Sequence, residues 1–411
     1  MNGALNPKGK SPFYPGQPVP VELFVGRKAQ IDRVTTRGSA QVAAGKPVAV
    51  FIQGEYGIGK SSIAGFLQAV AERQHGLHPI YVPVGGAETI DEVAMRVLEA
   101  TLRSGAFEAG RSERIRNWLG KYIGEQSLFG FTVHVEQLRK DAPSIANGIL
   151  PFFGEVYARL RDTGVKGIFV VLDEINGITA NPKFSHFIKG LVDTNAMARE
   201  QVPLLLALCG VEERRREMIA QHQPIDRIFD VVEITPMTDL EMQEFFGKAF
   251  ASVGMSVTDD ALKMMCHYSA GFPKIMHVVG DMAYWQDTDG VVNQADAINA
   301  VVVAADEVGK KYVDQQVYRA LRSTDYRSIL TKIAVQGPDL MAFNKRQIEE
   351  GLTETEKRKF NNFLQKMKTL KVLRAGDVRG EYVFNLRMVR LYIWLQSLPA
   401  SAAQPKQPQK G

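Results

Sequence analysis

The chain alternates between short apolar runs and longer segments with a helical repeat of apolar residues. Five apolar runs lie at residues 47–54, 78–86, 167–174, 203–210 and 229–235. Runs this short, bounded by Gly and Pro and rich in branched residues, are typical of buried strands. The intervening helical patterns are clearest at residues 61–74, 89–119 and 145–163. Apolar strands separated by helices predict a parallel sheet covered by helices on both faces.

The pattern changes twice towards the carboxyl end. Residues 239–316 read as helical and are interrupted only at residues 271–274, and a further region begins near Arg319. A weak alternation over residues 127–138 predicts a small hairpin. We therefore expect five parts: a flexible leader (1–20), an α/β domain (21–236), a small helical domain (237–318), a C-terminal domain (319–398) and a disordered tail (399–411).

The composition excludes several classes of protein. Of the 411 residues, 45% are hydrophobic and 23% are charged, which is ordinary for a globular chain. No apolar run reaches the roughly 18–20 residues that span a bilayer, and the N-terminus has no signal-peptide core. Cys209 and Cys266 form no CxxC pair, and the histidines have no metal-ligand spacing. We expect a cytoplasmic protein without a structural disulfide or zinc site and without a membrane partner.

One loop matches a phosphate-binding motif at every required position. The segment consists of Gly54, Glu55, Tyr56, Gly57, Ile58, Gly59, Lys60 and Ser61, followed by Ser62. Glycines let backbone N–H groups turn towards phosphate oxygens, and the following helix adds its positive dipole end. Lys60 is then expected to reach the β- and γ-phosphates, and Ser61 to coordinate Mg²⁺. A predicted strand before the loop and a predicted helix after it provide the context that this motif needs.

The apolar run at residues 167–174 ends in two carboxylates, Asp173 and Glu174. Open α/β sheets bind ligands at the carboxyl ends of their strands. Asp173 is expected to hold the magnesium, and Glu174 to orient or deprotonate the attacking water. The alternative is a strand followed by solvated acids at a turn. The phosphate loop upstream favours the first interpretation, and the second carboxylate favours hydrolysis of ATP over binding alone.

The sequence resembles the AAA+ ATPases of the origin-initiator and archaeal-ATPase/STAND-like branch. The resemblance is carried by residues 24–27 (FVGR), 54–61, 172–174 (LDE) and 271–274 (GFPK), and it covers roughly residues 20–285. It implies an α/β P-loop domain with a parallel sheet, a small helical lid and ATP with Mg²⁺ as the ligands. It also implies a self-assembling homo-oligomer.

The resemblance implies roles for further residues. Val25 and Arg27 would lie near the adenine, and Lys274 would act as a second sensor, where the family prefers Arg. The alternatives are a plain helix-entry turn for the first pair and a helix breaker around the lysine. Arg227 lies where the family has an arginine finger, which completes a neighbouring subunit's site; a surface arginine or a local ion pair is the alternative.

The strand at residues 203–210 corresponds to the family's sensor strand, where Asn, Thr or Ser usually faces the nucleotide. This chain has Cys209 and Gly210 there, so we expect Cys209 to be a small buried residue instead. The nearby Arg214, Arg215 and Arg216 are expected to form a solvated helix face, with phosphate or partner contact as the alternative.

The C-terminal region reads as a winged helix: three helical segments, then strands around Gly376 and Gly380. Residues 319–399 contain 16 Lys/Arg and 8 Asp/Glu, an excess of eight, whereas the whole chain has a net charge of +5. Basic charge on such a domain favours contact with double-stranded DNA. The candidate DNA-contacting residues are Lys357, Arg358, Lys359, Lys366, Lys368 and Arg379. The alternative is a charged face on a protein-docking domain.

Three functional hypotheses follow. In the first, ATP drives a DNA-binding protein that loads or recruits a partner on DNA. In the second, a signalling or antiviral-defence ATPase is switched by nucleotide, oligomerises and docks a separate effector protein through its winged helix. In the third, the chain is a nucleotide-binding scaffold with little or no hydrolysis. A steep salt dependence of DNA binding separates the first from the second.

Overall fold

A computed structural model describes residues 8–17, 20, 24–104, 148–318 and 323–398. The chain folds as two compact units. We call Pro18–Thr235 the sheet unit, and Met1–Gln17 together with Pro236–Gly411 the helical unit. The chain therefore passes between the units twice, and its second crossing falls next to residue 236, where the sequence predicts a domain boundary.

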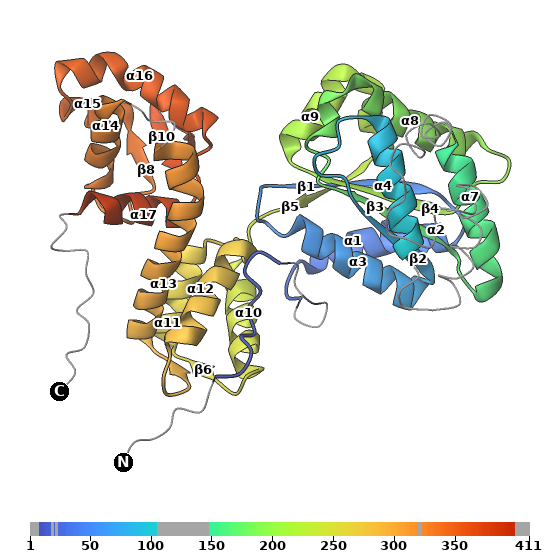
Figure 1. Ribbon diagram of the computed structural model, residues 1–411, viewed down its shortest axis with the longest axis horizontal. Coiled ribbons are helices and arrows are strands. Elements are labelled where there is room, and N and C mark those ends of the chain that lie inside the picture. The colour runs from blue at the N-terminus through green and yellow to red at the C-terminus, as the bar shows by residue number, and fades with distance from the viewer. Residues whose placement is uncertain (1–7, 18–19, 21–23, 105–147, 319–322, 399–411) are drawn as a thin grey trace, which may run out of the picture. The chain divides into compact units, whose positions relative to one another are not determined.

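The sheet unit contains five parallel strands in the order β2-β3-β4-β1-β5 (Figure 1). Their bounds are β1 Val48–Gly54, β2 Leu77–Pro83, β3 Gly167–Asp173, β4 Leu204–Gly210 and β5 Asp230–Ile234. The register pairs Ile52 with Cys209, and Leu172 with Leu208. The predicted parallel sheet is confirmed. Its order brings the ends of β1 and β3 to either side of β4.

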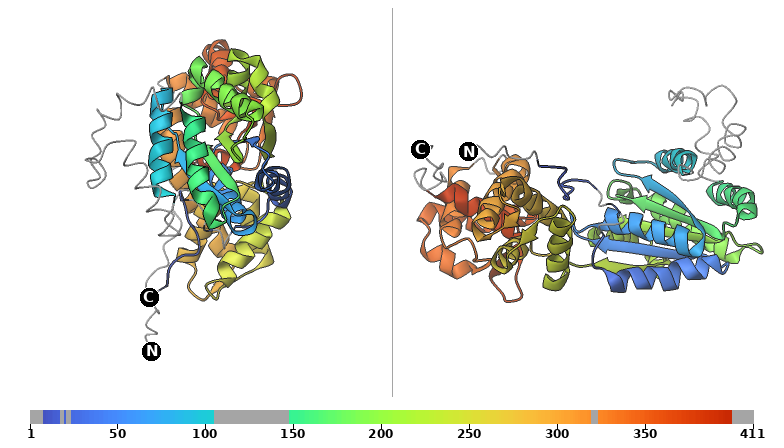
Figure 2. Two further views of the ribbon diagram at one scale, coloured as in Figure 1. Left: turned by 90° about the vertical axis from the view of Figure 1, so that its right-hand side faces the viewer. Right: turned by 90° about the horizontal axis from the view of Figure 1, so that it is seen from below.

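Helices cover both faces of this sheet, as Figure 2 shows. One face carries α1 Lys28–Val34, η2 Thr35–Ser39, α2 Ala40–Ala43 and α3 Lys60–His75. The other carries α4 Ile90–Arg103, α7 Ile149–Leu160, α8 Pro182–Met197 and α9 Glu212–Gln221. Among the described residues, the unit also contains the short helices η3 Arg161–Thr163, η4 Ile178–Ala180 and η5 Gln223–Ile228. The predicted hairpin at residues 127–138 lies outside the described residues, as does the predicted helix beyond residue 104.

Alternate residues of the central strands supply the two cores of the sheet unit. Ile168, Val170 and Leu172 belong to one cluster with α4, α7 and α8. Phe169 faces the other way, where its carbonyl accepts a hydrogen bond from Gln68 Nε2 of α3 at 2.9 Å. This period of two is what a strand buried on both faces requires.

The helical unit begins with four helices and two short strands. They are α10 Asp239–Ala251, β6 Ser256–Val257, α11 Asp259–Ser269, α12 Pro273–Gln286, β7 Val291–Val292 and α13 Gln294–Val308. Thr238 starts α10 with a capping box, in which its side chain accepts from the Glu241 N–H and the Glu241 carboxylate accepts from the Thr238 N–H. Such reciprocal bonds satisfy two donors that a helix start leaves without partners.

Part of the predicted leader packs on these helices. Phe13 is 4% exposed and contacts the rings of Phe245 and Phe250, with centroids 5.9 and 5.0 Å away. The Tyr14 N–H donates to His277 Nδ1 at 3.1 Å. The expectation of a flexible leader over residues 1–20 therefore does not hold for residues 8–17. Burial of one aromatic side chain, worth about 2 kcal/mol, stabilises this segment on the unit.

The rest of the helical unit has the order two helices, strand, two helices, two strands and helix. Its elements are η6 Gly309–Tyr318, α14 Thr324–Ala334, β8 Ala342–Asn344, α15 Lys345–Glu350, α16 Glu354–Thr369, β9 Leu373–Ala375, β10 Glu381–Phe384 and α17 Arg387–Ser397. The three strands form an antiparallel sheet in the order β8-β10-β9. Side chains join this part to α11: His267 Nε2 lies 3.2 Å from Asp339 Oδ1, and Arg387 Nη1 donates to the His267 carbonyl at 3.3 Å. Across the described helices, none combines the length and apolarity needed to cross a bilayer.

Candidate functional site

The loop between β1 and α3 lies at the carboxyl edge of the sheet. Gly57 and Gly59 have φ angles of 76° and 97°, in a region that side chains with a Cβ rarely adopt. Helix α3 begins immediately afterwards, at Lys60. The loop therefore leads into a helix N-terminus, whose dipole and N–H groups attract anions. Ile58 is buried beneath the loop, and Tyr56 is 62% exposed on it.

The ammonium group of Lys60 lies against the loop itself. Its Nζ donates to the carbonyls of Gly54 and Glu55, both at 2.8 Å, and lies 5.6 Å from the centroid of the Tyr56 ring. Burial lowers the pKa of Lys60, while the nearby Cys209, Asp173 and Glu174 act in the opposite direction. A cation inside the loop is the counter-charge that a bound polyphosphate requires.

Asp173 ends β3 and is only 4% exposed. Its Oδ1 accepts the Glu174 N–H at 2.9 Å, and its Oδ2 accepts the hydroxyl of Tyr81 on β2. The Ser61 side chain lies beside the same phenol. Burial raises the pKa of Tyr81 and Asp173 raises it further, whereas Ser61 acts to lower it, so the phenol keeps its proton. One hydroxyl therefore connects the two residues that the sequence identifies as metal ligands.

Glu174 has a left-handed backbone with φ of 59° and an exposed side chain. A non-glycine residue in this conformation costs about 1–3 kcal/mol, and such residues cluster at functional sites. Its carboxylate lies over Gly85, in the loop after β2: a Cβ added to Gly85 would be 2.4 Å from Glu174 Oε2. The conformation turns Glu174 away from the buried Asp173 and leaves its carboxylate accessible to water.

Arg27 connects the N-terminal turn to the phosphate loop. It is 5% exposed; its Nη2 donates to the Ile58 carbonyl at 2.9 Å, and its Nη1 to the Thr235 carbonyl. Arg27 therefore links the phosphate loop to Thr235, the residue after β5. Val25 lies two residues earlier and is half-buried. Arg27 thus contacts the phosphate loop, whereas contact of Val25 and Arg27 with adenine stays a prediction.

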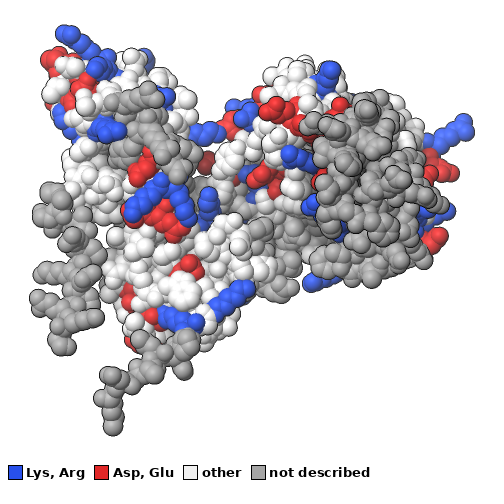
Figure 3. Space-filling view, in the orientation of Figure 1, with Lys and Arg blue, Asp and Glu red and all other residues white. Residues whose placement is uncertain are grey.

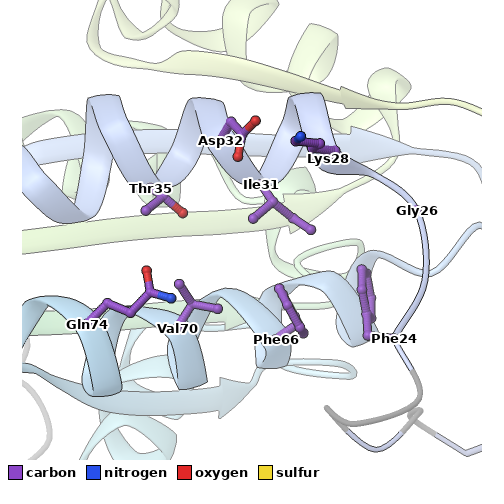
Figure 4. A pocket seen from close by; sticks show the side chains of 9 residues that line it. All are labelled: Phe24, Gly26, Lys28, Ile31, Asp32, Thr35, Phe66, Val70 and Gln74. Carbon is purple, nitrogen blue, oxygen red and sulfur yellow. The ribbon is translucent and has the colours of Figure 1, made fainter.

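A groove of about 350 Å³ runs between α1 and α3 beside this turn (Figure 4). At one end Phe24 stacks on Phe66, with ring centroids 4.5 Å apart and planes inclined by 22°. Its full lining is Phe24, Gly26, Lys28, Ile31, Asp32, Thr35, Phe66, Val70 and Gln74. The lining combines apolar side chains from both helices with the polar side chains of Lys28, Asp32, Thr35 and Gln74.

Cys209 is the next-to-last residue of β4, the strand that separates the phosphate loop from Asp173, and it is fully buried. Burial raises the pKa of this thiol, and Asp173 raises it further, so the side chain is a neutral thiol. The prediction of a small buried residue is confirmed.

Arg215, on the following helix α9, differs from the predicted solvated face. Its Nε donates to Gln53 Oε1 at 3.0 Å, and its Nη1 forms an ion pair with Asp226 at 2.5 Å. Gln53 directly precedes the phosphate loop, so Arg215 joins that loop to η5. Arg214 and Arg216 instead pair locally with Glu217 and Glu212.

The sequence did not reveal Tyr81 or Gln53 as parts of the site, and for Arg215 it gave phosphate or partner contact only as the alternative. Each is a single polar residue in a strand or helix, and its role depends on which strands are neighbours. The only signal was a polar side chain near the end of a predicted strand, at Gln53 and Tyr81.

The two residues predicted to act between subunits or domains lie on the surface. Arg227 is in η5, is exposed, and forms no ion pair or hydrogen bond among the described residues. Lys274 is exposed in the first turn of α12. Gly271, just before it, packs so closely on Met237 that a Cβ would be 2.5 Å from the Met237 carbonyl oxygen. Lys274 belongs to the helical unit, and its contact with nucleotide stays a prediction.

The predicted DNA-contacting residues divide into two groups. Lys357 pairs with Glu354 at 2.9 Å, and Lys359 pairs with Asp325. Within the described residues, Arg358, Lys366, Lys368 and Arg379 form no ion pair. Figure 3 shows basic and acidic side chains intermixed over this part of the molecule. The excess of Lys and Arg over Asp and Glu in this region is therefore spread over separate residues, with acidic residues between them.

The described residues contain no cluster of three or more His, Cys, Asp and Glu side chains that would hold a metal by itself. The pair Ser61 and Asp173 nevertheless fits Mg²⁺. This ion prefers oxygen ligands and typically takes one or two from the protein, with phosphates and water supplying the rest. The phenol of Tyr81 donates to Asp173 and lies beside Ser61, so both side chains lie within reach of one small group.

No family model and no curated protein matches the sequence. Solved structures do match the fold. A Walker-type ATPase of Pyrococcus abyssi is 15% identical with a TM-score of 0.57, covering 90% of this chain and 96% of that chain. The ORC2 protein of Aeropyrum pernix, in ADPNP-ADP complexes, is 12% identical with a TM-score of 0.56, covering 93% and 97%. With the five-stranded parallel sheet, these similarities show that the chain shares the α/β fold of those two proteins.

Proposed function

We propose that this chain is a magnesium-dependent ATPase that converts ATP and water to ADP and phosphate. The proposal rests on one observation above all: the phosphate loop and the end of β3 meet through Ser61, Tyr81 and Asp173. The nucleotide complexes of the similar ORC2 protein support a nucleotide as the ligand.

Each residue then has a role in the reaction. The loop from Gly54 to Gly59 binds the phosphates, with Lys60 between the β- and γ-phosphate oxygens. Ser61 and Asp173 hold the magnesium, which neutralises charge on the phosphate oxygens when it is bound. Glu174 orients a water molecule and accepts its proton as the water oxygen bonds to the γ-phosphorus. The bond from that phosphorus to the bridging oxygen breaks, and ADP leaves with the electron pair.

Nucleotide binding and phosphate release test this site together. We expect Lys60→Ala to abolish both, and Glu174→Gln to abolish turnover while ATP still binds. Lys46→Ala and Glu233→Gln are matched controls, since both residues are exposed and lie on or beside the same sheet. Turnover that survives Glu174→Gln would contradict the assignment of the catalytic carboxylate. Binding without any turnover in the wild type would favour the scaffold hypothesis.

We also propose that two further basic residues complete the site. Arg227 would act as an arginine finger on a second copy of this chain, because it is exposed and without a partner among the described residues. Such a residue stabilises charge on the transferring phosphoryl group. Its segment is tethered through Asp226 and Arg215 to Gln53, beside the phosphate loop. Lys274 would reach the nucleotide from the helical lid, as a point charge without the arginine fork.

For the C-terminal region we propose a winged helix that binds double-stranded DNA. The order of its elements, with the turn at Gly380 between β9 and β10, supports the winged helix. The contacts would come from Arg358, Lys366, Lys368 and Arg379. Because each phosphate contact contributes about 0.9 to the slope of log K against log salt, neutralising one should lower the slope by about that amount. Lys263→Ala on α11 is the control.

Docking of a separate effector protein is the second candidate function for this domain. Two observations favour it: Lys357 and Lys359 are already engaged by carboxylates, and Val378 is 66% exposed beside Arg379. An exposed apolar side chain between Asp377 and Arg379 suits a protein surface better than a phosphate backbone. DNA affinity that is weak and unchanged in Arg379→Ala would favour this candidate.

A further inference from the structure

We propose that Tyr81 is a positioning residue for magnesium: its hydroxyl holds Asp173 and Ser61 in the arrangement that binds the ion. This inference rests on the proposed function and deepens it, since it names a residue outside the motifs that controls metal binding. Tyr81 itself would not be a ligand. It would act through the two side chains that are.

The sheet directs Tyr81 towards this place. In the register of β2 with β3, Tyr81 pairs with Val171, and Pro83 pairs with Asp173. The neighbours Ile80 and Val82 belong to the core cluster with α4 and α7, so Tyr81 faces the opposite side, which α3 covers. Ser61 lies in the first turn of α3. The phenol therefore extends between the sheet and the start of that helix.

Both oxygens of the Asp173 carboxylate have a donor. The Glu174 N–H donates a hydrogen bond to Oδ1, and the Tyr81 hydroxyl donates one to Oδ2. Asp173 is 4% exposed, so water cannot readily replace a lost donor. Two donors on opposite oxygens fix the rotation of the carboxylate plane, while each oxygen keeps a second lone pair for a metal. Without the phenol, only the backbone N–H would orient the carboxylate.

The same phenol lies beside the side chain of Ser61, the other expected ligand. Outer partners of this kind orient metal ligands, and their loss typically lowers metal affinity by 10–100-fold. A different role would have the opposite effect. If the phenol occupied the position of the ion, magnesium would have to displace it, and removing the hydroxyl would tighten metal binding.

The test compares the wild type with Tyr81→Phe, which keeps the ring and removes only the hydroxyl. Tyr157→Phe is the matched control: Tyr157 is half-buried in α7 of the same unit, and its hydroxyl forms no hydrogen bond among the described residues. Binding of a fluorescent ATP analogue is measured in EDTA and then as magnesium is titrated. Electron paramagnetic resonance of Mn²⁺ with ADP gives a second readout that needs no turnover.

We expect Tyr81→Phe to raise the magnesium concentration at half-saturation by about tenfold and to weaken Mn²⁺ binding similarly. In EDTA, the variant should bind the ATP analogue as tightly as the wild type does. A general loss of structure would weaken that binding. An unchanged or lower half-saturation point would overturn the inference alone. A wild type that binds no ATP with magnesium would overturn the proposed function and this inference together.

Discussion

Replacing Gly85 by alanine should displace the Glu174 carboxylate, which we propose to be catalytic, without disturbing the nucleotide. A Cβ at this position would lie 2.4 Å from Glu174 Oε2 and 3.3 Å from Glu174 Cβ. Non-bonded heavy atoms prefer separations of about 3.5 Å, so the carboxylate must move by about 1 Å. A displacement of that size can cost about 10²-fold in rate, equivalent to about 2.7 kcal/mol of the barrier.

The assay is ATP turnover and nucleotide affinity of Gly85→Ala, with Gly190→Ala on α8 as the control. A Cβ at Gly190 meets nothing within 4 Å, so the control should keep full turnover. We expect kcat to fall about 100-fold in Gly85→Ala while the affinity for ATP stays within twofold. Wild-type turnover in this variant would refute the reasoning, because it would show that Glu174 does not need its position over Gly85.

Three further predictions concern other parts of the molecule. Arg227→Ala and Glu174→Gln should each abolish ATP turnover alone. A mixture of the two variants should regain turnover, because a mixed assembly pairs an intact Glu174 with an intact Arg227 of another copy. A mixture without turnover would contradict action of Arg227 between subunits. Arg390→Leu should lower the free energy of unfolding by about 3 kcal/mol, measured by urea denaturation, because Arg390 is fully buried and donates to four backbone carbonyls. Burial lowers the pKa of His277 to about 4 from 6.5. The unfolded chain therefore binds a proton that the folded chain excludes, and stability should fall by up to about 3 kcal/mol as pH decreases from 6.5 to 4. His277→Gln should make the free energy of unfolding less dependent on pH. If its pH dependence is the same in the variant, other groups must cause it.

The sequence predicts the parts of the site that are encoded locally. The glycines of the phosphate loop must lie next to Lys60 and Ser61 in the chain, because one turn and one helix start bind the phosphates. Asp173 and Glu174 follow an apolar run for a similar reason. These patterns need no knowledge of the strand order, and the structure has each of them at the end of the expected strand.

What the sequence could not predict depends on contacts between distant segments. Tyr81 meets Asp173 only because β2 lies beside β3, and Arg215 meets Gln53 only because α9 follows the strand next to β1. A local pattern does not encode strand order. The leader was misjudged for the same reason: Phe13 lies among many Pro and Gly residues, yet it packs on helix α10 more than 200 positions away.

The central claim is hydrolysis of ATP at the junction of the phosphate loop and β3. The most direct measurement is phosphate release from ATP by the purified full chain with magnesium, in parallel with Glu174→Gln at saturating nucleotide. We predict steady release by the wild type and none by the variant, although both bind ATP. Equal release by the two proteins would contradict the account, as would a wild type that binds ATP and never releases phosphate.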